Sequence, residues 1–344
     1  MYLSLDTAEA FAVKRNPTLS FPFFKENGEL LSITSNLGCL ADPRALDAYQ
    51  EFYDNASILM ECYPQYYRFF LGIVLDLENL GLQGNMGATL CEMTSDKSLL
   101  FYDTSDLRRM EAILLLSNRR ELTANEQDLR TSTYNNINNF IARPEHFTKF
   151  NRPFFYDLTH FIFYLTDYGR NPFPLENSPL ECLHYIGLLA LLDNDEDLLA
   201  EVAICLNYMG HEIPSFWDKE LTGFKNKIRI VYDETVQSAL NPAVDEYHSY
   251  FVLNWYYGVI GQDIFTERFN GRTPNFALPP KPTSLLSKIS TYVHKFTTGA
   301  LNGPQSQWKS HLNEDEHKRL RLISASSDHG SELITLLSNR MIRL

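Results

Sequence analysis

The sequence predicts an all-α protein whose antiparallel helical hairpins form a curved array or an α/α toroid, preceded by a short irregular N-terminal segment. Three observations support this prediction. Apolar residues recur at helical spacing along most of the 344 residues. Helix start and stop signals recur, separated by short loops, and short loops make neighbouring helices antiparallel. A strand pattern is almost absent. The sequence also lacks the fixed-period consensus of tetratricopeptide or ankyrin repeats.

The first 42 residues are expected to be irregular. Pro17, Pro22 and the pair Asn27-Gly28 interrupt this segment, and all three are typical of turns. Asn27-Gly28 predicts a small hairpin with Leu30, Leu31 and Ile33 on its second arm.

Residues 43–270 are predicted to form the main helical domain. Asp42-Pro43 and Ser178-Pro179 are the clearest helix starts, since each places a capping side chain before a proline in the first turn. The helix that follows the acidic turn Asp193–Asp197 is expected to end at Met209. The other helices are expected at about 43–60, 64–80, 86–100, 104–119, 125–141, 153–168, 179–192, 214–240 and 243–260.

The remaining residues, 271–344, are predicted to form a proline-rich loop followed by docked helices at about 283–298, 307–323 and 331–342. The loop contains Pro274, Pro279, Pro280 and Pro282. Proline disfavours helix, so this stretch is the best linker candidate.

The charge balance limits the partners. The chain has 43 acidic and 30 basic residues and a net charge of −13, which argues against nucleic acid and against an anionic membrane surface. The basic run His317–Arg321 follows Glu314–Glu316 and is interpreted as a solvated helix face.

The expected location is the cytoplasm. No stretch of 18 apolar residues predicts a membrane span, and the N-terminus lacks the pattern of a signal peptide. Five cysteines without a CxxC pair argue against a disulfide framework and against a zinc knuckle.

The segment Phe154–Tyr168 is the most informative for function. Its apolar residues form one helical stripe, and a second, polar stripe follows at positions i, i+3, i+7 and i+10: Asp157, His160, Tyr164 and Asp167. A helix with aromatic residues on nearly every side is expected to be buried. A buried polar stripe must be satisfied by partners or must line a cavity.

Two interpretations of this stripe stay open. In the first, His160 and Asp167 work as general acid and base or bind a ligand in a pocket. In the second, the stripe is a satisfied core network in which His160 binds a backbone carbonyl or a carboxylate.

A second candidate lies at Asp245-Glu246-Tyr247-His248, at the start of an aromatic helix. His248 shares a helix face with Trp255 and other apolar residues. A histidine in this setting is more often a satisfied core residue, so its functional interpretation depends on the first candidate.

No metal site or cofactor is assigned from the sequence. It contains neither HExxH nor the Glu-x-x-His repeat of di-iron bundles, and the phosphate motifs GxGxxG and GxxxxGK[ST] and the nucleophile motif GxSxG are missing. The acidic turn Asp193–Asp197 is interpreted as helix capping, because a second magnesium motif is missing. The glycine-rich stretch Gly81–Gly87 is interpreted as a helix-to-helix loop.

The run Tyr156-Asp-Leu-Thr-His160-Phe-Ile-Phe-Tyr-Leu-Thr-Asp167-Tyr-Gly169 resembles the signature of an uncharacterised bacterial all-helical family, a domain of unknown function. That signature has Leu-Thr-His and then Phe-Tyr-Leu-Thr-Asp-Phe-Gly. Two further elements are similar: Asp197-Leu-Leu-Ala-Glu201, and Glu246-Tyr247-His248 where the family has Asp-Tyr-His. The resemblance spans about residues 45–262. It implies a helical fold and candidate residues but no reaction.

Two functional hypotheses follow. In the first, the protein is an intracellular enzyme of specialised metabolism with an aromatic pocket. His160 is then the acid/base group, Asp167 orients it, and His248 is a second acid/base group or ligand. The remaining candidate binding residues are Tyr156, Asp157, Tyr164, Asp245, Tyr247 and Trp255. In the second hypothesis, a non-catalytic helical scaffold binds a protein or peptide. A small molecule or a peptide is the expected partner; substrate, cofactor and oligomeric state do not follow from the sequence.

Overall fold

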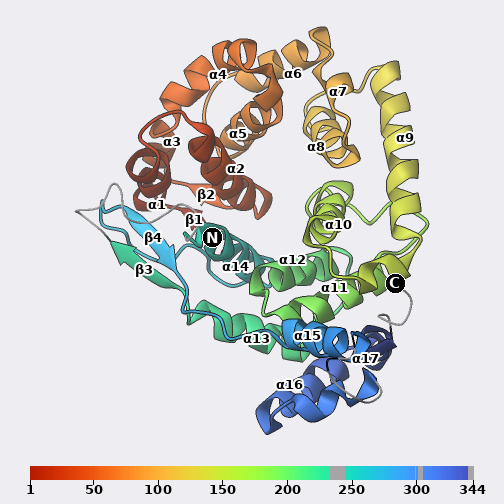
Figure 1. The fold of residues 1–344 in the computed structure, drawn as a ribbon. Coiled ribbons are helices and arrows are strands. Elements are labelled where there is room, and N and C mark those ends of the chain that lie inside the picture. The colour runs from red at the N-terminus through yellow and green to blue at the C-terminus, as the bar shows by residue number, and fades with distance from the viewer. Residues whose placement is uncertain (233–244, 299, 301–304, 340–344) are drawn as a thin grey trace. The chain divides into compact units, whose positions relative to one another are not determined.

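The computed structural model describes residues 1–232, 245–298, 300 and 305–339. Helices make up most of this part of the chain, and the only strands in it form two small two-stranded sheets (Figure 1). The predicted all-α fold class is therefore confirmed. The curved array or toroid stays a prediction.

The chain divides into two compact units. Unit 1 contains residues 1–137 and 228–278, and unit 2 contains residues 138–227 and 279–344. These units differ from the predicted division into residues 43–270 and 271–344, because the segment from Asn138 to Lys227 groups with the C-terminal residues. The predicted domain division stays a prediction.

Unit 1 holds most of the short elements. Strand β1 pairs with β2 in parallel, and β3 pairs with β4 antiparallel, with Ile230 opposite Phe276. The elements are β1 (Tyr2–Leu3), α1 (Leu5–Glu9), the π-helix η1 (Ala10–Arg15), α2 (Phe21–Asn36), β2 (Leu40–Ala41), α3 (Pro43–Asp47), α4 (Gln50–Cys62), the 3₁₀ helix η2 (Pro64–Tyr66), α5 (Tyr67–Asn79), α6 (Met86–Asp96), α7 (Leu99–Tyr102), α8 (Asp106–Ser117), α9 (Ala124–Ile141, which continues into unit 2), β3 (Arg229–Tyr232), α14 (Tyr247–Val259) and β4 (Pro274–Ala277).

The N-terminal segment corrects the prediction of irregular structure and a hairpin. Helix α2 passes through Asn27-Gly28, and Pro22 lies in its first turn, where proline is tolerated. Asn27 is fully buried, and its side-chain amide donates to the carbonyls of Phe11 and Phe23 and accepts from the Tyr49 hydroxyl. These contacts stabilise helix at Asn27-Gly28, although this dipeptide by itself predicts a turn.

The glycine-rich stretch joins α5 to α6, in agreement with the helix-to-helix interpretation. A Cβ atom on Gly84 would lie 2.2 Å from the Tyr53 hydroxyl, and one on Gly87 would lie 2.7 Å from a Glu78 oxygen. Tyr53 and Glu78 hydrogen-bond to each other at 2.7 Å. Close packing therefore favours glycine at both positions.

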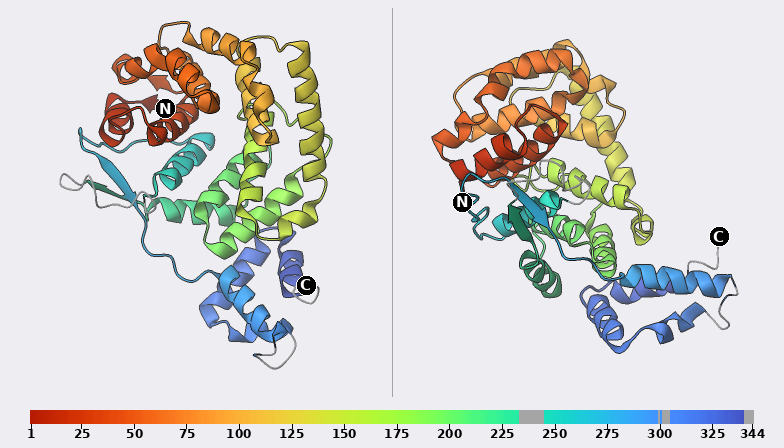
Figure 2. Two further views of the ribbon diagram at one scale, coloured as in Figure 1. Left: turned by 45° about the horizontal axis from the view of Figure 1, so that its top comes forward. Right: turned by 60° about the vertical axis from the view of Figure 1, so that its left-hand side comes forward.

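Unit 2 is arranged around α11 (Leu180–Asp193), which is buried along most of its length. Helix α11 packs against α12 (Glu196–Tyr208), the 3₁₀ helix η3 (Pro144–Thr148), α15 (Leu285–Thr297), α16 (Glu314–Ala325) and α17 (Gly330–Asn339). The other elements are α10 (Arg152–Leu165), α13 (Ser215–Lys225) and the 3₁₀ helix η5 (Gln305–His311). The C-terminal helices gather at one end of the unit (Figure 2).

The predicted helix over residues 214–240 is wrong in its second part. Helix α13 ends at Lys225, and Arg229–Tyr232 form strand β3. Residues 233–240 lie outside the described part of the chain. The alternation of polar and apolar residues in Arg229–Tyr232 is too short to predict a strand beside the longer helical pattern.

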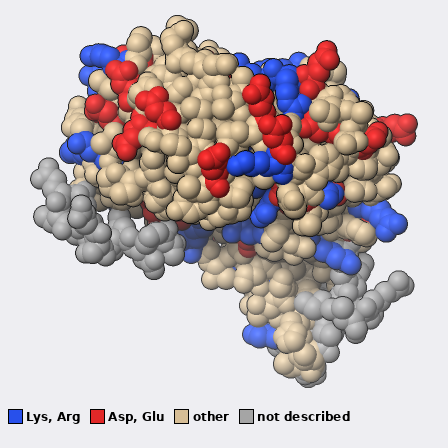
Figure 3. Space-filling view, turned by 90° about the horizontal axis from the view of Figure 1, so that it is seen from above, with Lys and Arg blue, Asp and Glu red and all other residues tan. Residues whose placement is uncertain are grey.

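Acidic and basic side chains are interspersed on the surface drawn in Figure 3, between larger uncharged areas. Among the described residues, no helix is long and apolar enough to cross a membrane.

Candidate functional site

The candidate site of unit 2 begins with α10, which carries most of the predicted polar stripe. Asn151 caps this helix by accepting a hydrogen bond from the Phe154 amide, and Pro153 lies in the first turn. The face formed by Phe155, Leu158 and Ile162 is fully buried. Tyr156 and Thr159, which are not members of that stripe, hydrogen-bond to residues of α12.

Helix α12 supplies two buried carboxylates. Asp197 and Glu201 are four residues apart, so they project from the same face, and their nearest carboxylate oxygens lie within 4.8 Å of each other. Asp197 is 8% exposed and Glu201 is 2% exposed. Burying two like charges at this separation is costly, so the arrangement needs stabilising partners.

Hydroxyl groups of α10 hold both carboxylates. Tyr156 donates to Oδ2 of Asp197 at 2.7 Å, and Thr159 donates to Oε2 of Glu201 at 2.6 Å. Burial raises the pKa of Tyr156, and the nearby charges of Asp197 and Glu201 raise it further. Tyr156 therefore remains a protonated hydrogen-bond donor across the physiological pH range.

His160 lies beside this pair. Its Nδ1 is 2.8 Å from the Tyr156 carbonyl oxygen and 3.8 Å from Oε2 of Glu201. A carbonyl can only accept, so Nδ1 carries a proton, and in the neutral ring the lone pair is on Nε2. The His160 side chain is 34% exposed, so solvent reaches it.

Two further carboxyl groups flank the site. Asp195 caps α12 by accepting from the Leu198 amide, and its Oδ2 is 2.6 Å from the Arg152 guanidinium. Burial raises the pKa of Asp195 despite Arg152. Burial also raises the pKa of the half-buried Asp157, while the nearby His160 acts in the opposite direction.

The acidic turn before α12 is bound from the C-terminal segment as well. Ser284 donates to Asp193 at 2.9 Å, and Lys281 donates to the Asn194 carbonyl at 2.8 Å. Lys281 also pairs with Glu196 at 2.9 Å. The predicted capping role holds for Asp195, while Asp193 and Glu196 bind side chains of the C-terminal segment.

The placement of Asp167 on the helical stripe is wrong. Helix α10 ends at Leu165, and Asp167, Tyr168 and Gly169 all have left-handed backbone angles, with φ of +46°, +53° and +84°. The Asp167 carboxylate pairs with Arg170 at 3.0 Å. The turn is fixed by packing, because a Cβ atom on Gly169 would lie 2.4 Å from the Tyr208 ring.

The ring of Tyr164 lies 6.1 Å from that of His160, so Tyr164 remains on the His160 side of α10. Tyr164 is 8% exposed. The structure therefore brings together Tyr156, Asp157, His160 and Tyr164 of the predicted site.

The other predicted residues belong to unit 1. Asp245 accepts from the Phe276 amide at 2.9 Å and pairs with Arg15, which also binds Glu26 at 2.8 Å. Arg15 lies near the ring of Tyr247, with 5.7 Å between its Cζ atom and the ring centre. Asp245 and Tyr247 are therefore members of a buried ion network that joins the N-terminus to β4.

His248 is half-buried on α14, and Trp255 lies further along the same helix, 8% exposed. His248 and His160 belong to different units. The pocket predicted to contain both stays a prediction.

Sequence reasoning missed Thr159, Asp195, Asp197 and Glu201 as site residues. A detectable signal was the pair Asp197 and Glu201, because two carboxylates one turn apart interrupt an otherwise apolar helix. Asp197 and Glu201 also offer carboxylate oxygens within 4.8 Å of each other, and such oxygens suit Mg²⁺ or Mn²⁺.

Comparison with known proteins gives one match. The family model of a domain of unknown function, DUF6902, covers residues 5–338. No curated protein and no solved structure matches the chain. Because the family model spans nearly the whole sequence, the chain belongs to the DUF6902 family of domains of unknown function.

Proposed function

We propose that the protein is an intracellular enzyme of specialised metabolism that binds a small molecule beside His160 and performs general acid–base chemistry on it. The observation that carries the proposal is the pair Asp197 and Glu201, buried within 4.8 Å of each other beside an imidazole that solvent reaches. Packing two helices together requires no such group, and a buried carboxylate costs free energy unless it is used or compensated.

Four residues of unit 2 have roles in this proposal. His160 exchanges a proton through Nε2, since Nδ1 is held by the Tyr156 carbonyl. Glu201, 3.8 Å from His160, stabilises the imidazolium that forms, and it takes the place of Asp167, which the sequence predicts to orient His160. Tyr156 acts as a fixed donor, and the raised pKa of Asp157 suits an acid that is protonated near the substrate.

For the unit 1 residues His248, Tyr247 and Trp255, the proposal rests on the sequence pattern alone. The proposed location is the cytoplasm, which is supported by five free thiols, as expected in a reducing compartment.

The proposal is tested by screening a library of polar metabolites, with and without Mn²⁺ or Zn²⁺, for compounds that raise the melting temperature. Binding at the site predicts that His160→Gln and Glu201→Gln abolish the shift. The control His146→Gln, whose side chain is 47% exposed on η3, should preserve it. A compound that stabilises all variants equally binds elsewhere and contradicts the proposed site.

A second candidate function, the scaffold that binds a protein or peptide, is favoured by an aromatic surface on unit 1. Phe21 is 49% exposed, and its ring lies 5.7 Å from Tyr66 and 5.8 Å from Phe69. Exposed aromatic groups are common at protein interfaces. Pull-down with wild type and Phe21→Ser tests it, and partners retained equally by both argue against this surface.

A further inference from the structure

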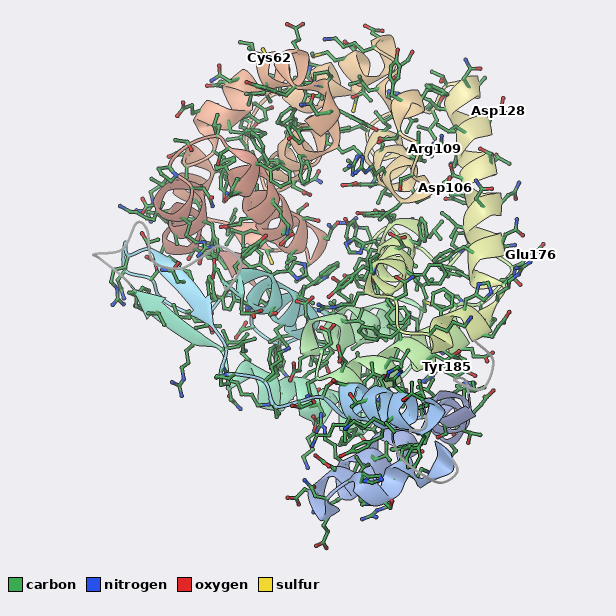
Figure 4. The ribbon with its side chains drawn as sticks, in the orientation of Figure 1. Cys62, Asp106, Arg109, Asp128, Glu176 and Tyr185 are labelled. Atoms are coloured by element: carbon green, nitrogen blue, oxygen red, sulfur yellow. The ribbon has the colours of Figure 1, made fainter. Side chains whose placement is uncertain are left out.

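Two histidines face each other where the C-terminal helices dock on α11. His184 lies on α11, His329 lies in the turn between α16 and α17, and their ring centres are 5.6 Å apart. The neighbouring Tyr185, labelled in Figure 4, lies on α11 on the side of the C-terminal helices, with its ring 5.3 Å from that of His329. The histidine pair therefore bridges two elements that are distant in sequence.

The same turn is held by few polar contacts. Ser327 Oγ lies 3.1 Å from Nδ1 of His184 and accepts from the His329 amide at 3.3 Å. Trp217 of α13 donates to Ser326 at 2.9 Å. The α16–α17 turn is thus in direct polar contact with the His184 ring.

The surroundings of the pair disfavour a second positive charge. Burial lowers the pKa of His184, as do His329 and His211, while Asp328 acts in the opposite direction. Glu332 on α17 lies 4.0 Å from Nδ1 of His329. Asp328 and Glu332 are both exposed, so solvent weakens their compensation of charge on the histidines.

We propose that the histidine pair is a pH-sensitive contact that holds α16 and α17 against α11 while the rings are neutral and releases them when both are protonated. Two positive charges at this separation repel each other, and the repulsion is stronger in a half-buried position than in water. Because the folded form resists protonation of His184, docking is complete above the ordinary histidine pKa and weakens as the pH falls below it. This inference is independent of the acid–base site on α10 and α12.

Hydrogen–deuterium exchange on the full chain tests the proposal. Between about pH 7.5 and about pH 5.5, protection of the amides of residues 326–338, corrected for intrinsic exchange, should fall by about tenfold. His184→Gln should remove most of this pH dependence, because burial of that ring is the main cause of its lowered pKa, and His329→Gln should reduce it. The control His317→Gln, on α16 but outside the pair, should preserve it. Equal protection of the wild type at both pH values overturns the proposal, as does a pH dependence in His329→Gln that is as large as in the wild type.

A second measurement does not depend on any variant. Titration of the His184 ring by NMR in the wild-type protein should give a midpoint below the ordinary histidine value of 6.5. A midpoint at or above 6.5 overturns the proposal, because the pair would then accept its second charge without cost.

Discussion

The hydroxyl of Tyr156 on α10 donates a 2.7 Å hydrogen bond to the buried carboxylate of Asp197 on α12. This bond joins the segment Phe154–Tyr168, which is the most informative in the sequence, to the acidic turn Asp193–Asp197, which is interpreted from the sequence as helix capping. A single substitution, Tyr156→Phe, removes this bond and so tests its contribution.

Tyr156→Phe should destabilise the protein by about 1–3 kcal/mol, because Asp197 loses a hydrogen bond in a buried position. At this chain length, about 1 kcal/mol corresponds to about 2 °C or less in melting temperature. Calorimetry of the variant measures the loss. Tyr102→Phe is the matched control, since Tyr102 is 78% exposed and should show no change. Equal melting temperatures for both variants would contradict a stabilising role for the Tyr156 hydroxyl.

His160→Ala and His248→Ala should each lower stability by less than about 1 kcal/mol, because both rings are partly exposed. In the enzyme proposal, ligand binding nevertheless collapses in His160→Ala. Melting curves and binding to any compound found in the screen are measured together. A loss of about 2–4 kcal/mol in both variants would instead mark the histidines as core residues with buried partners.

The free energy of unfolding should decrease at acidic pH, because Glu126 becomes protonated. Burial opposes its ionisation, but hydrogen bonds from Arg120, Thr123 and Ser95 outweigh burial and lower the pKa of Glu126 to about 2. The ordinary value is 4.5, so this contribution is complete above pH 4.5 and is lost as the pH falls toward 2.

Urea unfolding between neutral pH and pH 3 measures this dependence. Glu126→Gln should cost about 1–3 kcal/mol at neutral pH and flatten the acid dependence. Glu61→Gln, whose side chain is 65% exposed, should leave both unchanged. A Glu126→Gln variant with the acid dependence of the wild type would assign that dependence to other carboxylates.

Gly187→Ala should destabilise α11 by about 1–3 kcal/mol, because the new Cβ atom would lie 2.2 Å from the buried Trp217 ring. Gly223→Ala on α13 is the matched control: a Cβ atom there meets nothing within 4 Å. Alanine is the better helix former, so this change should stabilise the protein by about 0.5–1 kcal/mol. Denaturant midpoints distinguish the two variants. A shift of both midpoints in the same direction would contradict close packing of Trp217 on Gly187.

The helices with strong apolar periodicity could be predicted from the sequence, and α9 and α10 begin within one residue of the expected positions. Helix α2 could not, because its stability at Asn27 depends on Phe11 and Tyr49, which are distant in the chain. The end of α10 was missed for a related reason. Two non-glycine residues there, Asp167 and Tyr168, adopt left-handed angles that local sequence rarely indicates.

The α10 residues of the candidate site could be predicted from the sequence, and its carboxylates on α12 could not. Asp157, His160 and Tyr164 follow from helical spacing, and Tyr156 follows as a neighbouring aromatic residue that lines the predicted pocket. The carboxylates that face them follow only from the packing of α10 on α12, because capping accounts for acidic residues near a helix start equally well.

The interleaved course of the chain has a consequence for biosynthesis. Arg15 leaves the ribosome 230 residues before its partner Asp245. Unit 1 is complete only once residue 278 has been synthesised, after residues 138–227 of unit 2 have emerged. A nonsense codon between 138 and 244 therefore removes α14 and β4 and leaves the nascent N-terminal helices without their last neighbours. Such truncated products should be substrates for chaperones and proteases rather than functional fragments.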